Sequence, residues 1–320
     1  ELDDRFEISD TMEHEDAILV RSAKLHDYDF PAELLCIARA GAGVNNIPLD
    51  RAAEAGIVVF NTPGANANGV KELTIAALLL ASRKISQGIT WVKEQAAAGA
   101  DVAAVVEKGK AAYVGPEIQG KTLGVVGLGA IGVLVANAAA ALGMQIVGYD
   151  PFLSVQHALN LTPGVKVVST LEELYGQADY ISLHLPMTPE TKGTLNDAAF
   201  AAMKDGVRIV NLARGELVDT EALKAALASG KCAAYVTDFP NSETAAMEGV
   251  VAIPHLGAST PESEDNCAMM AARQVRDYLD NGNIVNSVNL PVLSMAWAAK
   301  NRVCVLTKGA DAAAIAAAVP

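Results

Sequence analysis

The sequence has few cysteines and a deficit of basic charge. Only four cysteines occur in 320 residues, widely spaced and without a C-x-x-C pattern. The sequence therefore predicts neither a disulfide framework nor a zinc site, and no metal is expected. A reducing, cytoplasmic setting is expected instead. Lysine and arginine number 24 against 37 aspartates and glutamates, a formal net charge of −13. An acidic surface disfavours nucleic acid and anionic membranes as partners.

Long hydrophobic runs are also absent. No apolar run reaches the ~18 residues that a membrane span needs, and no signal-peptide pattern opens the sequence. Short apolar runs are nevertheless abundant, since 51% of the residues are hydrophobic and the mean hydropathy is +0.26. With 320 residues, the chain is predicted to bury two cores in two domains.

The first part of the chain alternates strands with helices. Strands are predicted over residues 17–20, 34–38 and 57–60, and a short helix over 49–55. A helical stretch over 70–97 is too long for one ordinary helix and is predicted to break at Gly88. It is interpreted as the connection between two domains, and residues 99–115 are expected to form a loop with a short helix.

A regular βαβ pattern begins at Lys121. Helices are expected between the strands, notably over 130–142 and 220–228, and a long helix over 261–281 precedes an extended segment at 284–290. This alternation predicts a doubly wound parallel sheet of six or seven strands, of the Rossmann type. The predicted strands lie at residues 122–127, 145–149, 165–168, 180–183, 207–211, 232–237 and 250–253.

A glycine pattern joins the first of these strands to its helix. Gly127, Gly129 and Gly132 form G-x-G-x-x-G, with Ala130 and Ile131 inside the motif. The first glycine permits a tight turn, the second lets a pyrophosphate approach the backbone, and the third lets the helix pack close to the strand. The helix N-terminus would then offer free N–H groups to the phosphates. The motif predicts a dinucleotide site.

An acidic residue follows at the end of the next strand. Asp150 lies 18 residues beyond Gly132, near the spacing expected for a carboxylate that accepts both ribose hydroxyls. Such a carboxylate repels a 2′-phosphate, which favours NAD over NADP as the cofactor. The alternative is that Asp150 only caps the turn that follows.

Three reactive side chains come directly after predicted strands, at the end of the sheet where ligands bind. Arg214 can bind a carboxylate through two hydrogen bonds or can pair on the surface with Glu216. Glu243 can be a functional or a solvated loop acid. His255 is a candidate acid/base but can also make only local hydrogen bonds.

Together these groups suit the oxidation of a hydroxy acid. Hydride leaves C2 while the hydroxyl loses a proton, for which His255 is the natural acceptor near neutral pH. Glu243 would orient the imidazole ring and favour its protonated form. Arg214 would hold the substrate carboxylate and polarise the carbonyl oxygen.

The sequence resembles the D-2-hydroxyacid dehydrogenase family over nearly its whole length. The resemblance implies a Rossmann-type NAD domain and a second, flavodoxin-like α/β substrate domain that is discontinuous in sequence. The motifs that carry it are RAGAGVNN (39–46), NTP (61–63), GLGAIG (127–132), HLP (184–186), NLARGELVD (211–219) and PHLGAST (254–260).

The resemblance also assigns roles to residues. Arg214, Glu243 and His255 would form the catalytic triad. The local sequence that ends at Glu243 is DFPNSE, where the family more commonly has D-V-F-x-x-E. Residues expected to line NAD, besides the glycine motif, are Thr62, Asp150, His184, Pro186, Ala213, Asp238 and Gly257. Residues expected to cradle the substrate carboxylate or phosphate are Arg39, Ala40, Gly41 and Asn66.

Domain limits follow from the same resemblance. The substrate domain is expected to comprise residues 1–87 and 268–290, and the NAD domain residues 88–267. Residues 291–320 would form a linker and the start of an incomplete ACT-like regulatory domain, with a strand over 302–307 and a helix in the alanine-rich end. A homodimer or higher homo-oligomer is expected, formed largely through the NAD domain.

The favoured substrate is 3-phospho-D-glycerate, oxidised to 3-phosphohydroxypyruvate in the first step of L-serine biosynthesis. One alternative is a glyoxylate or hydroxypyruvate reductase with the same triad. A phosphate pocket would decide between them, with Arg39 as a candidate and Lys71 either a second candidate or a solvated helix lysine. A further alternative is a non-catalytic NAD-binding scaffold, because a fold alone does not fix function.

Overall fold

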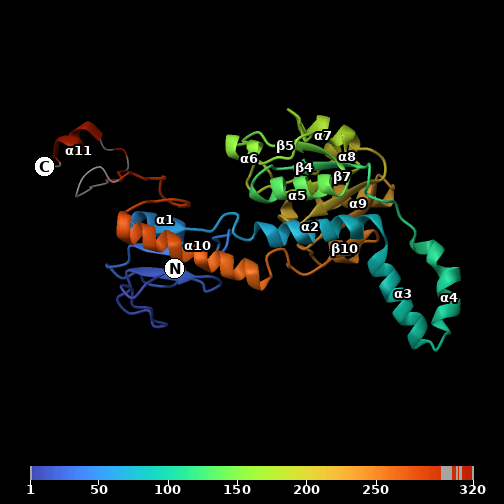
Figure 1. The fold of residues 1–320 in the computed structure, drawn as a ribbon, viewed down its shortest axis with the longest axis horizontal. Coiled ribbons are helices and arrows are strands. Elements are labelled where there is room, and N and C mark those ends of the chain that lie inside the picture. Colours follow the sequence, from blue (N-terminus) through green and yellow to red (C-terminus); the bar gives the residue numbers. More distant parts are fainter. Residues whose placement is uncertain (1, 297–304, 308, 310–311, 319–320) are drawn as a thin grey trace. The chain divides into compact units, whose positions relative to one another are not determined.

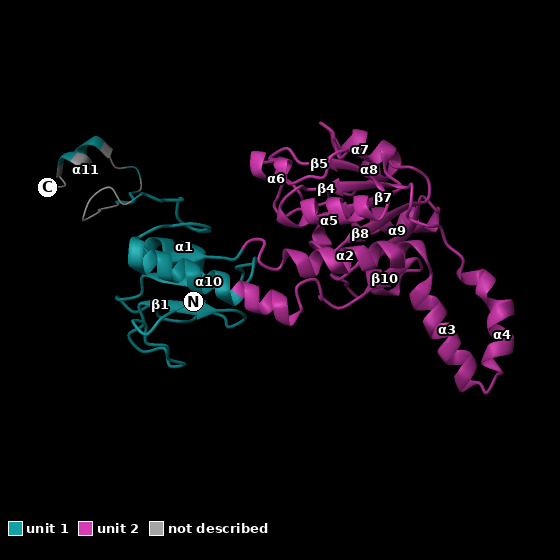
Figure 2. Cartoon of the chain, viewed as in Figure 1, with its two compact units in different colours: residues 1–62, 268–320 teal, residues 63–267 magenta. Residues whose placement is uncertain are grey.

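The protein is described by a computed structural model, which covers residues 2–296, 305–307, 309 and 312–318. It divides into two compact units (Figure 2), unit 1 with residues 1–62 and 268–320 and unit 2 with residues 63–267. Of the expected ACT-like segment, the strand over 302–307 lies mostly outside the described residues, whereas α11 (Ala312–Ala318) is helical.

Unit 2 contains the predicted doubly wound sheet (Figure 1), in which all seven strands run parallel. Their order is β10-β9-β8-β7-β4-β5-β6, so the winding direction reverses between β4 and β7. The strands are β4 (Thr122–Val126), β5 (Gln145–Tyr149), β6 (Lys166–Val167), β7 (Tyr180–Leu183), β8 (Val207–Asn211), β9 (Cys232–Thr237) and β10 (Val250–Ala252).

Helices cover both faces of this sheet because its strands are apolar on both sides. In β7, Tyr180 packs into the layer of α2 and α5, whereas Ile181 and Leu183 pack into the layer of α7, α8 and α9. The helices of unit 2 that cover the sheet or connect its strands are α2 (Ala67–Ser82), α5 (Ala130–Ala141), α6 (Val155–Leu159), α7 (Leu171–Gln177), α8 (Asp197–Ala202) and α9 (Thr220–Ala228).

Helix α2 belongs to unit 2, where it packs against α5, β8 and β9. Its residues Ala77, Leu78 and Ala81 are buried in the same core as Val135 of α5. The structural division after residue 62 therefore differs from the sequence-based limit after residue 87, which placed α2 with the other domain. The later limit falls at residue 268 in both divisions.

The predicted break at Gly88 was wrong. Helix α2 ends at Ser82, Arg83 is extended, and α3 (Ile85–Ala97) runs through Gly88. Gly115 lies against the end of α2, where a Cβ on Gly115 would come within 2.0 Å of the Ser82 carbonyl oxygen. Helix α4 (Val102–Gly109) and the 3-10 turn η1 (Lys110–Tyr113) then lead back toward the sheet.

Unit 1 is a smaller parallel α/β unit. Its sheet has the order β1-β2-β3, with β1 (Ala17–Val20), β2 (Cys36–Arg39) and β3 (Val58–Phe60). Helix α1 (Leu49–Glu54) packs on one face through Ala52, and α10 (Pro261–Asn281) packs on the other through Ala271 and Val275. Both units thus have the parallel α/β architecture that the sequence predicts.

The predicted extended return segment runs antiparallel along β3. Ser287 forms a bridge with Phe60. The Asn289 side chain accepts a hydrogen bond from the Val59 N–H and donates one to the Ile57 carbonyl, both at 2.8 Å. The edge of the small sheet is therefore closed by a segment more than 220 residues away in sequence, as these two bonds span 230 and 232 residues.

Candidate active site

The glycine motif forms the turn between β4 and α5. Gly127 has a φ of +94°, and a Cβ there would come within 2.7 Å of the His184 carbonyl oxygen. Gly132 lies so close to this turn that a Cβ would be 1.9 Å from the Gly127 carbonyl oxygen. Both positions therefore require glycine for steric reasons.

Gly129 differs from these two because nothing lies within 4 Å of the place where its Cβ would be. It precedes α5, whose N-terminus has no side-chain cap in the structure as described. Free N–H groups at a helix N-terminus bind phosphate oxygens. The open space at Gly129 and the uncapped helix thus fit a pyrophosphate.

Asp150 follows β5, next to this turn. Its carboxylate accepts hydrogen bonds from the Leu128 and Phe152 backbone N–H groups, both at 2.8 Å. The bond to Phe152 caps the turn that follows, as the capping alternative proposed, and the bond to Leu128 braces the glycine turn. Each carboxylate oxygen retains acceptor capacity, so this bracing is compatible with the ribose contact that the sequence predicts.

His184 and Pro186 lie beyond the end of β7. The imidazole Nε2 of His184 is 2.9 Å from the Ser182 Oγ, and removal from solvent lowers the pKa of His184 to about 4. This ring is therefore neutral at physiological pH. The Pro186 carbonyl accepts a hydrogen bond from the Thr191 hydroxyl at 2.7 Å, which holds the loop that follows.

Asp238 follows β9 and is 1% exposed. Its Oδ2 accepts a hydrogen bond from the Gly257 N–H at 3.1 Å, whereas its Oδ1 is buried with no partner in the described part of the chain. Burial raises the pKa of Asp238, and the Gly257 N–H and nearby His255 oppose that shift. A buried oxygen without a donor fits a ligand that brings an N–H group, such as the carboxamide of nicotinamide.

Arg214 and His255 both contact the ring of Phe239. The guanidinium carbon of Arg214 lies 5.5 Å from the ring centroid, and the His255 ring centroid lies 4.4 Å away at an interplanar angle of 46°. Arg214 also donates to the Ala213 carbonyl at 2.6 Å. The structure therefore brings two of the three predicted catalytic side chains together on one aromatic ring.

Glu243, the third, forms an ion pair with Lys224 of α9, with an Nζ–Oε1 distance of 3.3 Å. It precedes the 3-10 turn η3 (Thr244–Ala246), and its side chain is 48% exposed. No hydrogen bond or ion pair between Glu243 and His255 occurs within the described residues. Its role in orienting the imidazole stays a prediction.

The predicted substrate loop lies in unit 1, at the end of β2. Arg39 Nε donates to the Arg21 carbonyl at 3.2 Å. The Gly41 carbonyl accepts from the Thr62 N–H at 3.2 Å, and Ala40 donates its N–H to Val20. The Thr62 hydroxyl is buried without a partner among the described residues, so it can serve a bound ligand.

Two further predicted residues lie in unit 2. Asn66 stands at the start of α2 and makes no side-chain cap. Lys71 pairs with Glu72 at 3.5 Å, and its side chain is only 22% exposed. These residues and the Arg39 loop thus belong to different units. Their joint role in binding the substrate stays a prediction.

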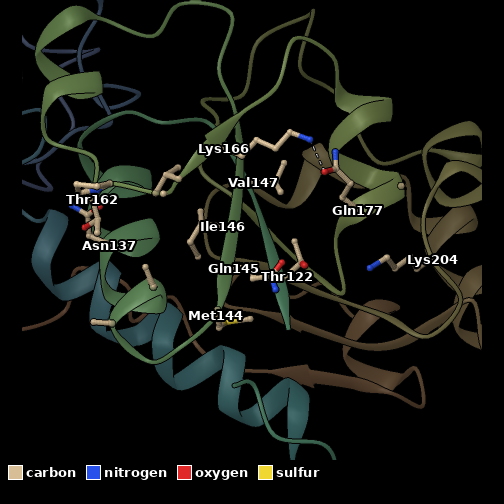
Figure 3. Close-up of a pocket in the computed structure, with 16 residues that line it drawn as sticks. Thr122, Asn137, Met144, Gln145, Ile146, Val147, Thr162, Lys166, Gln177 and Lys204 are labelled. Carbon is tan, nitrogen blue, oxygen red and sulfur yellow. Dashed lines mark hydrogen bonds between the residues drawn. The ribbon is translucent and has the colours of Figure 1, made fainter. Parts of the chain in front are cut away.

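A cavity of about 910 Å³ opens at the other end of the sheet, where β4, β5 and β6 begin (Figure 3). Its lysines already have partners, since Lys166 bonds Gln177 at 2.8 Å and Lys204 pairs with Asp179 at 3.0 Å. Ligands of such sheets bind at the carboxyl ends of the strands, so this cavity is distinct from the candidate site.

Across the described ranges, no group of three or more histidine, cysteine, aspartate or glutamate side chains could hold a metal ion. No helix in those ranges is long and apolar enough to cross a membrane.

The chain belongs to the family of D-isomer specific 2-hydroxyacid dehydrogenases. Residues 75–257 match the family model described as the NAD binding domain of these enzymes. The glycine turn, Asp150 and Asp238 all lie inside this match, so the region that fits a dinucleotide is the region that defines the family. The chain is thus a member of an NAD-dependent oxidoreductase family.

The curated relatives that the chain resembles include D-3-phosphoglycerate dehydrogenases. The chain is 40% identical over 299 residues to D-3-phosphoglycerate dehydrogenase of Mycobacterium leprae, and 38% identical over 291 residues to that of Rattus norvegicus. These matches cover 90% and 88% of the chain but 53% and 52% of the relatives. The chain therefore spans about half the length of the curated relatives it matches.

Solved structures of several dehydrogenases resemble the chain. NAD+-bound 3-phosphoglycerate dehydrogenase of Entamoeba histolytica is 32% identical with a TM-score of 0.66, covering 86% of this chain and 82% of that one. A glyoxylate reductase from Paecilomyes thermophila is 32% identical with a TM-score of 0.71, covering 85% and 83%. D-mandelate dehydrogenase of Rhodotorula graminis reaches 0.74 at 28% identity, covering 87% and 84%.

Phe239 is the site residue that the sequence analysis missed. The only sequence feature that set Phe239 apart was the unusual local sequence DFPNSE. An aromatic residue in a loop does not by itself indicate what its ring contacts, so the link to Arg214 and His255 emerged only from the three-dimensional arrangement.

Proposed function

We propose that the chain oxidises 3-phospho-D-glycerate to 3-phosphohydroxypyruvate with NAD, the first step of L-serine biosynthesis. The joint contact of Arg214 and His255 with Phe239 carries the proposal that this domain is catalytic. The curated relatives named D-3-phosphoglycerate dehydrogenase, 37–40% identical to the chain, support the choice of substrate. Unit 1 would bind the substrate and unit 2 the cofactor.

NAD, when bound, supplies the acceptor for the hydride that leaves C2. His255 takes the proton from the C2 hydroxyl, and Arg214 holds the substrate carboxylate through charge-assisted hydrogen bonds. Asp238 offers its unpaired Oδ1 to the nicotinamide carboxamide. The uncapped N-terminus of α5 holds the pyrophosphate.

NADH absorbance tests the proposal directly. The purified chain is assayed with NAD and 3-phosphoglycerate, beside glycerate and lactate, and in reverse with phosphohydroxypyruvate. Turnover confined to the phosphorylated pair supports the proposal. The variant His255→Ala is expected to lose roughly 10²–10⁴-fold in rate while it still binds NAD. Bound NAD without turnover of any acid would instead indicate a non-catalytic scaffold.

A glyoxylate or hydroxypyruvate reductase is the second candidate, supported by the solved glyoxylate reductase that resembles the chain. Phosphate recognition separates the two. If Arg39 binds the phosphate, Arg39→Ala raises KM for 3-phosphoglycerate about tenfold and leaves KM for an unphosphorylated acid nearly unchanged. Lys71→Ala is the parallel test for the other candidate cation. Turnover of only unphosphorylated acids would favour the reductase.

We also propose that the chain forms a homodimer through the helices α3 and α4, which stand away from the sheet of unit 2 (Figure 2). Neither helix has a buried residue. Ile85, Ile89 and Val92 are 44%, 52% and 37% exposed and share one face of α3. A second copy would cover this apolar stripe. Sedimentation should show a dimer that Ile89→Lys weakens, whereas Glu94→Lys, on the opposite face of α3, has little effect.

The cytoplasm is the proposed site of action. Cys36, Cys232 and Cys267 are buried free thiols, and burial raises the pKa of Cys36 and of Cys232 to about 12. Inert, reduced thiols of this kind are common in reducing compartments. Fractionation of cells that produce the protein would test this proposal.

A further inference from the structure

We infer that Phe239 is a positioning residue, which holds the guanidinium of Arg214 and the imidazole of His255 at a fixed separation. The inference rests on the proposed function and extends it, since it concerns how the reacting groups are placed. Phe239 would touch neither substrate nor cofactor in this role and would act only through its two neighbours.

Sheet order places Phe239 between the other two side chains. Arg214, Phe239 and His255 follow β8, β9 and β10, and β9 is the middle one of these three neighbouring strands. The ring centroid of Phe239 lies 5.5 Å from the guanidinium carbon and 4.4 Å from the imidazole centroid. One ring therefore contacts side chains delivered from both adjacent strands.

The backbone that carries the ring is well fixed. Phe239 is half-buried, and its N–H donates to the buried Thr237 hydroxyl at 3.0 Å. A Cβ on Gly215 would lie 3.6 Å from the Phe239 Cβ, so the loop after β8 packs directly against it. The preceding Asp238 is tied to Gly257 at 3.1 Å. Contacts to both neighbouring loops thus fix the backbone and Cβ from which the ring extends.

Arg214 and His255 have few other restraints. Both are exposed. Within the described residues, the Arg214 guanidinium donates only to the adjacent Ala213 carbonyl, and the His255 ring makes no hydrogen bond. Glu243 is paired with Lys224 instead. The aromatic contact is therefore the main restraint on the orientation of the imidazole.

The chemistry makes this restraint useful. In the proposed reaction the C2–H bond breaks with its electron pair, which leaves as hydride to NAD, and the hydroxyl proton passes to His255 as the C2=O bond forms. The imidazole becomes positively charged in this step, and an aromatic face attracts a cation. Displacement of a reacting group by about 1 Å can cost roughly 10²-fold in rate.

The test compares Phe239→Leu with Phe239→Tyr. Phe239→Leu keeps a hydrophobic side chain of similar volume but removes the ring, and kcat is expected to fall about tenfold or more. Phe239→Tyr keeps the ring and should restore most of the activity. The dissociation constant of NAD and the thermal midpoint should stay close to wild type in both. As a matched control, Phe6→Leu removes another arginine–aromatic contact, of 5.4 Å with Arg5, and should leave kcat unchanged.

A second measurement does not depend on turnover. The ring current of Phe239 should shift the imidazole proton signals of His255, assigned by comparison with His255→Gln. Loss of that shift in Phe239→Leu confirms the contact even if the proposed substrate is wrong. Wild-type kcat in Phe239→Leu would overturn the inference, as would an unchanged imidazole signal. A parallel loss of NAD affinity would show that the ring is part of the cofactor site instead.

Discussion

The Asp238 carboxylate accepts a hydrogen bond from the Gly257 N–H through one oxygen and buries the other without a partner. Residues 238 and 257 follow adjacent strands, β9 and β10, so this bond ties two loops of the site together. An unpaired buried oxygen costs free energy in the unliganded protein. Such a group is retained where a ligand supplies the missing donor.

Asp238→Asn should therefore stabilise the free protein. Burial raises the pKa of Asp238 above its ordinary value of 3.8, so the folded state binds its proton more tightly than the unfolded state does. The free energy of unfolding consequently falls as pH rises through the pKa of this carboxyl, and the loss persists at neutral pH. Asp238→Asn should melt at a higher temperature than wild type at pH 7, with the difference vanishing at pH values below the ordinary pKa of 3.8. An equal shift at all pH values would contradict this account.

The two glycines at the start of α5 should respond differently to alanine. In Gly132→Ala the new Cβ would meet the Gly127 carbonyl oxygen at 1.9 Å, so the variant should lose about 1–3 kcal/mol of unfolding free energy. In Gly129→Ala the Cβ enters open space, so stability should hold while NAD affinity falls about tenfold, or 1.4 kcal/mol. Denaturant unfolding and NAD titration separate the two effects. Unchanged NAD affinity in Gly129→Ala would argue against the pyrophosphate site.

His184 should make the protein sensitive to mild acid. Its pKa falls to about 4 in the folded state from an ordinary value of 6.5, so the unfolded chain binds more protons between pH 4 and pH 6.5. Stability contributed by this group is then complete above about pH 6.5 and is lost as pH falls toward 4. His184→Gln should show a shallower decline of the thermal midpoint over that window. Identical slopes for the two proteins would indicate that His184 does not drive the effect.

Glu243 and its ion-pair partner Lys224 provide a matched pair of variants. If Glu243 orients His255 during catalysis, Glu243→Gln should lower kcat by about tenfold or more. Lys224→Met breaks the same exposed ion pair but should leave kcat near wild type and cost at most ~1 kcal/mol of stability. Equal losses in both variants would mean that the ion pair, rather than the carboxylate, matters. Steady-state kinetics on the two proteins decides.

The glycine motif and the parallel sheet were predictable because their signals are local. The spacing of Gly127 to Gly132, the apolar run before it and Asp150 after it all lie within about 30 residues, the length of one βαβ unit. The structure adds the physical reason, since a Cβ at Gly127 or Gly132 would collide with backbone oxygens.

Other features depend on contacts between residues far apart in sequence, which a local sequence pattern does not reveal. At the helix break at Arg83, Gly115 packs against Ser82, 33 residues away, whereas Gly88 lies inside α3 with the Tyr113 ring 3.8 Å from its would-be Cβ. The pairing of Glu243 with Lys224 joins a loop to a helix 19 residues earlier. Neither partner could be identified from local pattern alone.

The return segment along β3 bears on how the chain folds during synthesis. Unit 2 is complete in sequence once residue 267 has been made, and domains generally fold as units as they emerge from the ribosome. Unit 1 begins first but needs α10 to cover its sheet and Asn289 to pair with the backbone at Ile57 and Val59. The N-terminal strands must therefore wait, with one face and one edge uncovered, until the whole of the larger unit has been translated.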